Sequence, residues 1–173
     1  MFDKISSRLH ATHPDVCERI LELAVEIARE GREGRRIGTL LTVGDAENVL
    51  SHSRPLILDP IALHPAAART IWSENLRGTL KELVQLDGAF IFDDQGTLVA
   101  GCRYLDAKVS NVELPMGFGS RHLAAASIST VTSAIGIVVS ESAIVRIFED
   151  GRLIGDVIPE LWLLNREQVF GKA

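Results

Sequence analysis

Apolar side chains recur along this chain with two different periods, and the change between them predicts the order of helices and strands. From Asp15 to Ile27 they recur every three or four residues, which predicts a helix with one buried face and Asp15 as its cap. The same spacing marks residues 76–86 and, more briefly, residues 65–72. Segment 29–36 is charged and punctuated by glycine, which is typical of a solvated turn.

Short continuous apolar runs predict strands. Residues 37–44 form one such run, and Asp45 after it is a suitable cap for a short helix through Leu50. Residues 54–60 are bracketed by prolines, which suits an extended segment at a sheet edge. The other strands are expected in two hairpins, the first turned by Asp-Asp-Gln-Gly and the second following a central helix. Their predicted ranges are 86–92, 97–104, 134–140, 143–148 and 153–158.

The chain of 173 residues is long enough for one domain with a substantial core. We expect a flexible N-terminal segment over residues 1–14 and a single domain over residues 15–173. Hairpins before and after a central helix, with no regular alternation of strand and helix, predict the fold class. That class is α/β, with a mixed, mostly antiparallel β-sheet flanked by helices.

Charge and cysteine content narrow the class of protein. A net charge of −5 argues against a nucleic-acid partner, so any anionic ligand must be held by a local cluster of cations and amides. The two cysteines lie far apart, as expected of free thiols in a reducing cytosol. The uncharged run from Leu123 to Ser140 carries six Ser/Thr residues and fits a buried helix and strand better than a membrane span. Met1 to Lys4 lacks the apolar core of a signal peptide, so we expect a cytoplasmic protein with no membrane segment.

Residues 115–126, Pro-Met-Gly-Phe-Gly-Ser-Arg-His-Leu-Ala-Ala-Ala, carry the strongest local signal for a ligand site. Two glycines permit a tight turn, Ser120 is a good N-cap, and the alanine-rich run favours a helix. Arg121 and His122 then lie in the first helical turn, where free N–H groups and the helix dipole favour an anion. Two basic side chains are unfavourable at this positive end of the helix dipole, and a bound phosphate would offset that repulsion. The alternative is an ordinary loop-to-helix junction with a solvated arginine and a partly buried histidine.

Three short segments carry side chains suited to phosphoryl chemistry, each at a predicted strand end or helix start, where ligand sites in α/β folds commonly form. Together they offer an anion cradle, two carboxylates for a hard cation, and small hydroxyl groups. Phosphoryl transfer requires such a set. Each segment alone is weak evidence, because strand-end aspartates and Ser-Glu pairs are common on surfaces. The segments are Asp87-Gly88-Ala89, Ser120-Arg121-His122 and Ser140-Glu141.

The order and spacing of these segments resemble the diadenylate cyclase (DAC, or DisA-N) domain family, whose members condense two ATP molecules into cyclic di-AMP and release two pyrophosphates. The resemblance runs from about Glu30 to Ile158, and the approach Gly31 to Gly34 is similar to archaeal members in particular. Asp-Gly-Ala in isolation is a weak motif, whereas the ordered set is specific. The matching segments are Gly38-Thr39, Val43-Gly44-Asp45, Gln85 to Ala89, Tyr104-Leu105, Gly119 to His122 and Val138 to Glu141.

For the reacting end of the nucleotide, the resemblance implies roles at two segments. Asp87 would engage the ribose 3′-hydroxyl and a divalent metal, Mg²⁺ or Mn²⁺. Gly88 and Ala89 would let the backbone pass close to the nucleotide. Ser140 and Glu141 fall on a motif that contacts phosphate and metal, so the implied metal residues are Asp87 and Glu141.

For the rest of the ATP molecule, the resemblance assigns the base and the triphosphate to different segments. Tyr104 and Leu105 match the segment that lines the adenine pocket, and an aromatic–apolar pair suits a purine face. Ser120, Arg121 and His122 fall on the triphosphate-binding motif. Each assignment has a structural alternative, in which the side chain only packs or only carries surface charge.

Leu123 departs from the family pattern, because the motif is usually Arg-His-Arg and its second arginine is missing here. Losing a direct phosphate contact of this kind would cost about 1.5–3 kcal/mol. Position 123 lies about 200° around the helix from Arg121, since each residue advances about 100°. The two side chains therefore need not reach the same phosphate, which favours partial activity over complete loss.

The resemblance therefore predicts a metal-dependent diadenylate cyclase with ATP as substrate. A site built from these motifs holds one ATP, so two protomers must face each other in a homodimer or higher homo-oligomer. The alternative is a non-catalytic adenine-nucleotide sensor on the same fold, with Leu123 marking the lost activity. A more distant alternative is a domain whose function is protein association.

Overall fold

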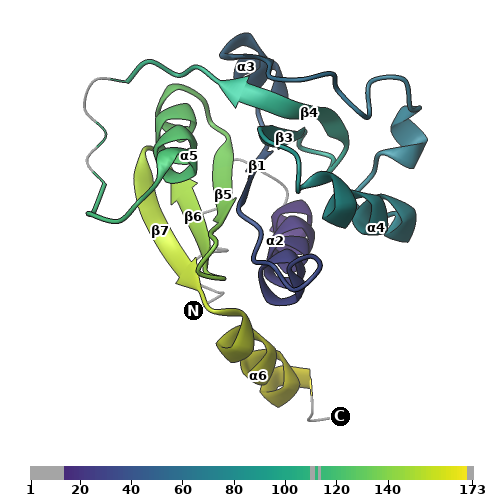
Figure 1. Cartoon of the computed structure of the whole chain (residues 1–173), viewed down its shortest axis with the longest axis vertical. Coiled ribbons are helices and arrows are strands. Elements are labelled where there is room, and N and C mark those ends of the chain that lie inside the picture. Colours follow the sequence, from purple (N-terminus) through teal and green to yellow (C-terminus); the bar gives the residue numbers. More distant parts are fainter. Residues whose placement is uncertain (1–13, 110–111, 113, 171–173) are drawn as a thin grey trace.

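One mixed β-sheet with helices on both faces forms the body of the chain (Figure 1). The computed structural model describes residues 14–109, 112 and 114–170. Within them the strands are β1 (Thr39–Val43), β2 (Ser53–Pro55), β3 (Ala89–Phe92), β4 (Leu98–Leu105), β5 (Ile135–Val139), β6 (Val145–Glu149) and β7 (Arg152–Val157). Their order across the sheet is β2-β4-β3-β1-β5-β6-β7, with β1 and β3 parallel and the other neighbouring pairs antiparallel. The predicted α/β class with a mostly antiparallel sheet is confirmed.

Two hydrophobic cores lie on opposite faces of this sheet. The helices are α2 (Pro14–Glu30), α3 (Ala46–Ser51), α4 (Glu74–Leu83), α5 (Ser120–Val131) and α6 (Pro159–Phe170), with a 3₁₀ turn η1 at Ala66–Ala68. Leu41 belongs to the core that contains Ile20 of α2, whereas its neighbour Leu40 belongs to the core that contains Ile128 of α5. This separation follows from the two-residue repeat of a strand. α5 approaches β5 closely because position 136 is glycine, where an added Cβ would lie 2.9 Å from the Cβ of Ala125.

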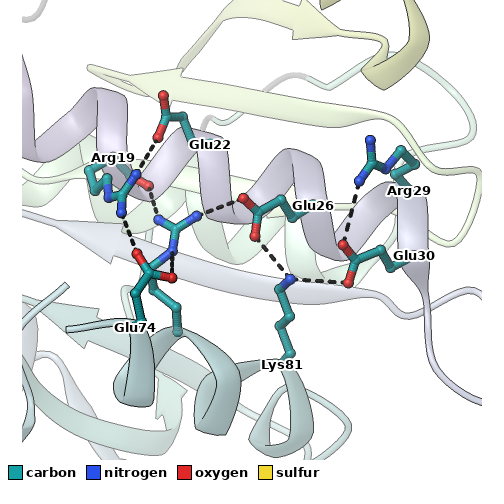
Figure 2. Close-up of polar contacts among 8 residues, drawn as sticks. Arg19, Glu22, Glu26, Arg29, Glu30, Glu74 and Lys81 are labelled. Carbon is teal, nitrogen blue, oxygen red and sulfur yellow. Dashed lines mark hydrogen bonds and ion pairs between the residues drawn. The ribbon is translucent and has the colours of Figure 1, made fainter. Parts of the chain in front are cut away.

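Ion pairs connect α2 to α4 on the face of the sheet that α2 covers (Figure 2). Arg77, with its side chain only 5% exposed, donates a hydrogen bond of 2.7 Å to Glu26. Lys81 bridges Glu26 at 2.9 Å and Glu30 at 3.0 Å. Burial alone would lower the pKa of Lys81, but the hydrogen bonds and charges of the two glutamates outweigh burial and raise it. These contacts join α4 to α2.

The helix expected over residues 65–72 is reduced to η1. The chain after it pairs with the first hairpin instead, because Ile71 N–H donates to the carbonyl of Gly96 at 2.8 Å and Leu98 N–H donates to the carbonyl of Arg69 at 2.7 Å. Asp45 is the N-cap residue of α3, as predicted, but its side chain caps no backbone N–H of the helix. Its backbone is left-handed, with φ of 45°, and its carboxylate accepts from Asn48 Nδ2 and from the distant Ser133 N–H instead.

Most other elements agree with the sequence predictions. Both hairpins form. An edge strand also forms near the predicted place, but β2 ends at Pro55, and residues 56–60 lie outside it. Cys17 and Cys102 are both buried, and neither is part of a disulfide. Of the predicted flexible segment, residues 1–13 lie outside the described residues, and Pro14 already belongs to α2. Among the described residues, no helix combines the length and apolarity that crossing a membrane requires.

Candidate active site

The three predicted segments meet around the guanidinium of Arg121, at the start of α5. Arg121 Nη2 lies 3.7 Å from Asp87 Oδ1, and Arg121 Nη1 lies 3.4 Å from Glu141 Oε1. Gly38, just before β1, makes room for this arrangement. A Cβ at Gly38 would lie 2.8 Å from Arg121 Nη1 and 3.3 Å from Glu141 Cγ. Side chains from positions 87, 121 and 141 therefore converge on one place, beside the backbone of position 38.

On one side of Arg121 lies a cavity of about 460 Å³, which we call the larger cavity. It runs along the N-terminal turn of α5 and the ends of β5 and β6. The two segments predicted to contact phosphate, Ser120 to His122 and Ser140-Glu141, both line it. Its polar lining residues are Ser120, Arg121, His122, Ser140, Glu141, Ser142 and Arg146.

On the other side of Arg121 lies a second cavity of about 240 Å³, which we call the smaller cavity. Its lining includes Asp87, Gly88, Ala89, Tyr104, Leu105 and Leu56. Ser120 and Arg121 line both cavities, so the two adjoin at the first turn of α5. Every site residue predicted from the sequence lines one cavity or the other.

Helix α5 begins one residue earlier than the sequence predicted. Its N-cap is Gly119, and Ser120 is already in the helix. The Gly119 N–H donates to Nδ1 of His122 at 3.3 Å, so the histidine takes the position that Glu or Gln occupies in a capping box. Ser120 consequently has no capping role and stays exposed beside both cavities.

His122 is buried, with 7% of its surface exposed. Its ring packs against two phenylalanines, with centroid distances of 4.7 Å to Phe118 and 6.2 Å to Phe148. Burial lowers its pKa, and the charges of Arg146 and Arg121 lower it further, while Asp156 opposes them. The imidazole is therefore neutral near pH 7 and acts here as a packed hydrogen-bonding group rather than a free cation.

The lowered pKa of His122 predicts a loss of stability in mild acid. The unfolded chain takes up this proton near pH 6.5, whereas the folded chain resists it, so the free energy of unfolding falls as pH drops below about 6.5 and levels off below the folded pKa. Chemical denaturation at pH 7.5 and 5.5 measures this. His122→Gln should reduce the acid-dependent loss, and His64→Gln, at an exposed loop histidine, should not. If both variants lose as much stability between pH 7.5 and 5.5 as each other, this explanation would be contradicted.

Ser140 and Glu141 sit in the tight connection from β5 to β6 and differ in exposure. Ser140 is buried; its Oγ lies 2.6 Å from Ser142 Oγ and accepts from Ile144 N–H at 3.3 Å. The Glu141 side chain is mostly exposed and turned toward Arg121. The buried serine thus shapes the turn, and the exposed carboxylate is available for a cation or ligand.

Around the smaller cavity, Asp87 and Tyr104 remain accessible. The Asp87 side chain is 82% exposed, and its contact with Arg121 is long. Tyr104 is about half-exposed and lies under the Arg54 guanidinium, 4.5 Å from its ring centroid. Leu105 is buried and belongs to the core under α5, so it forms a wall of the cavity rather than a mobile contact.

Leu123 lies on the exposed side of α5. It is 48% exposed and is absent from the lining of both cavities. Leu123 is therefore not a core residue. The Leu123 side chain itself lies in neither described cavity.

Arg146 reaches the larger cavity from β6 and is not among the site residues predicted from the sequence. It lies 3.1 Å from His122 and packs over the ring of Phe118. A local signal was present, because a charged residue interrupts the apolar run Val145 to Phe148. The sequence could not show that α5 crosses the sheet at this residue.

These motifs and cavities agree with the comparisons with known proteins. Residues 26–153 match the DAC family model, described as DisA bacterial checkpoint controller nucleotide-binding. This match covers most of the chain, and the protein therefore belongs to the DAC family. The family model lies within the predicted domain of residues 15–173, whose exact limits stay a prediction.

Two curated archaeal relatives are each named diadenylate cyclase. The relative from Methanocaldococcus jannaschii is 49% identical over 148 residues, which cover 85% of this chain and 47% of the relative. The relative from Haloferax volcanii is 38% identical over 151 residues, which cover 86% of this chain and 55% of the relative. The chain thus spans about half the length of the curated relatives it matches, and the predicted likeness to archaeal members is confirmed.

Two solved structures share the fold. DacA from Staphylococcus aureus, solved as a double mutant, gives a TM-score of 0.55 at 20% identity and covers 89% of this chain and 94% of that one. A hypothetical membrane spanning protein from Bacillus cereus gives 0.57 at 19% identity and covers 79% of this chain and 61% of that one. At these identities the likeness concerns the fold alone.

Proposed function

We propose that this chain is a diadenylate cyclase that condenses two ATP molecules into cyclic di-AMP and two pyrophosphates. The observation that carries the proposal is the position of Arg121, which joins the two cavities and lies between Asp87 and Glu141. A nucleotide spanning both cavities would have its reacting groups beside this guanidinium. The names of the two archaeal relatives support the same activity.

The division of the site into two cavities supports separate binding of the nucleoside and the phosphates. The smaller cavity offers Tyr104 and Leu105 to adenine and Asp87 to the ribose 3′-hydroxyl. The larger cavity offers the free N–H groups at the start of α5 to the triphosphate. Arg121 would place the α-phosphate where the two cavities meet and offset its developing negative charge.

The carboxylates at this junction fit a divalent metal such as Mg²⁺ or Mn²⁺. Among the residues that the structure describes, no cluster of three or more His, Cys, Asp or Glu side chains forms a complete metal cage. Magnesium in nucleotide sites is commonly held by one or two carboxylates together with substrate phosphates. Asp87 and Glu141 would hold the metal here, and it would neutralise charge on the transferring phosphate.

The reaction further implies a homodimer or higher homo-oligomer with facing sites. Cyclic di-AMP needs two ATP molecules, each presenting its 3′-hydroxyl to the α-phosphorus of the other. The described residues of one chain form one set of Asp87, Arg121 and Glu141. A second protomer would supply the second ATP.

This requirement predicts that activity per protomer falls on dilution below the dimer dissociation constant, because a lone protomer lacks its partner site. Cyclic di-AMP formation should be followed at protein concentrations for which light scattering reports the oligomeric state. A rate per protomer that stays constant while the protein becomes monomeric would contradict the facing-site proposal.

The second candidate function is a nucleotide sensor without turnover. Leu123, in place of the family's usual arginine, favours it. Leu123 is exposed and lies outside both cavities, so this leucine blocks neither of them and does not by itself argue against synthesis. Incubating the purified chain with ATP and Mn²⁺, then identifying products by mass spectrometry, distinguishes the two. Cyclic di-AMP supports the cyclase, and bound but unchanged ATP supports the sensor.

A further inference from the structure

Arg146 brings a second guanidinium to the larger cavity from a strand rather than from α5. It lies on β6 and lines the cavity opposite the first turn of the helix. Its Nη1 lies 3.1 Å from Nε2 of His122. The predicted phosphate motif does not include this residue, and none of the roles proposed above uses it.

The two N–H groups that approach the His122 ring cannot both find an acceptor on it. A neutral imidazole accepts at one nitrogen only, and an arginine never accepts. The Gly119 N–H approaches Nδ1 at 3.3 Å, and Arg146 Nη1–H approaches Nε2. If Nδ1 accepts from Gly119, then Nε2 carries the proton, and its N–H faces the N–H of Arg146. In the other tautomer Nε2 accepts from Arg146, and the N–H on Nδ1 faces the N–H of Gly119. An imidazolium carries a proton on both nitrogens and accepts from neither group.

The surroundings hold Arg146 in this position. Its guanidinium lies 4.6 Å from the Phe118 ring centroid, and Nε lies 3.0 Å from Asp156 Oδ1 on β7. Its side chain is only 15% exposed. A stacked, ion-paired arginine loses little further freedom when it binds an oxyanion, and its planar set of donors suits phosphate.

We propose that Arg146 is a phosphate-binding residue, and that its Nη1–H and the Nε2–H of His122 donate together to one oxyanion. The ligand class is an oligophosphate, either the triphosphate of a nucleotide or released pyrophosphate. An anion at this place gives both donors an acceptor and balances the cationic lining of the cavity. The inference deepens the proposed function and rests on it only for the nucleotide identity of the ligand.

The test separates phosphate binding from a structural role of the Arg146–Asp156 pair. Calorimetric titration should use inorganic tripolyphosphate and adenosine as separate probes on the purified full chain. Arg146→Gln should weaken the binding of tripolyphosphate about ten- to hundredfold, the usual effect of losing a charge-assisted hydrogen bond. The same variant should bind adenosine as wild type does. Asp156→Asn removes the ion pair but keeps the guanidinium, so it should bind tripolyphosphate within about threefold of wild type.

The results for phosphate binding can support or overturn the role of Arg146 whether or not the chain synthesises cyclic di-AMP. Tripolyphosphate binding lost with Arg146→Gln supports the inference even if the chain makes no cyclic di-AMP. Unchanged tripolyphosphate binding in Arg146→Gln, equal losses in Arg146→Gln and Asp156→Asn, or no binding by wild type would each overturn it. None of these results depends on whether wild type turns over ATP.

A measurement on the wild-type chain covers the case in which Arg146→Gln does not fold. Long-range ¹⁵N–¹H NMR of His122 reports which ring nitrogen carries the proton. We expect the proton on Nε2, with a shift of that resonance when tripolyphosphate is added. A proton on Nδ1 with no response to tripolyphosphate would mean that Nε2 simply accepts from Arg146, and the inference would fail.

Discussion

Asp87→Asn is expected to reduce cyclic di-AMP synthesis by roughly 10²–10⁴-fold, the range typical of losing a group that assists proton transfer. The proposal assigns this carboxylate to the ribose 3′-hydroxyl and to the metal. Its side chain is 82% exposed and meets Arg121 only at 3.7 Å, so folding depends little on it. The melting temperature should therefore stay within about 1–2 °C of wild type.

The control for Asp87→Asn is the same change at Asp106, an exposed aspartate just after β4 that lines neither cavity. Asp106→Asn should keep wild-type synthesis, which shows that the loss does not follow from a change of net charge. Rates and melting curves should be measured on the same preparations. Full turnover by Asp87→Asn would contradict its assigned role.

Gly88→Ala is expected to lower the free energy of unfolding by about 4 kcal/mol or more, which corresponds to a fall in Tm of roughly 8–16 °C. Gly88 has a φ of +106°, which an L side chain rarely adopts. An added Cβ would also lie 2.6 Å from the carbonyl carbon of Cys102 and 2.8 Å from the nitrogen of Arg103. Both contacts are with the backbone of β4, which cannot move without disturbing the β3–β4 hairpin.

Gly117→Ala is the matched control for Gly88→Ala. Gly117 has a similar φ of +94°, but an added Cβ would meet nothing within 4 Å. It should therefore show only the cost of the backbone conformation, about 1–3 kcal/mol. The difference between the two variants in thermal and urea denaturation isolates the close approach of β4. Equal destabilisation would mean that this approach is not what requires glycine at position 88.

Local patterns predicted the elements whose stability depends on their own sequence. The spacing of Ile20 and its apolar neighbours predicted α2, and the turn sequence around Gly96, with φ of +79°, predicted the first hairpin. Prediction failed where distant segments decide the conformation. Residues 69–71 pair with that hairpin instead of continuing a helix, and the carboxylate of Asp45, the N-cap residue of α3, binds Ser133 N–H instead of a helix N–H.

The site was predicted in its parts but not in its assembly. Physical chemistry of the residues indicated phosphate at Arg121 and a hard cation at Asp87, and the ordered motifs indicated the family. The strand order β4-β3-β1-β5-β6, which brings these parts together, depends on long-range pairing that no local pattern specifies. Arg146 was missed for that reason, since its neighbour His122 is 24 residues away in sequence.

The most direct test of the cyclase proposal is the product balance of the purified chain. The chain is incubated with ATP and Mg²⁺ or Mn²⁺, and nucleotides are identified by mass spectrometry while pyrophosphate is assayed in parallel. The proposal predicts cyclic di-AMP and two pyrophosphates for each molecule formed, with synthesis stopped by a chelator and by Asp87→Asn. ATP that binds but remains unchanged with either metal at dimer-forming concentrations would contradict it.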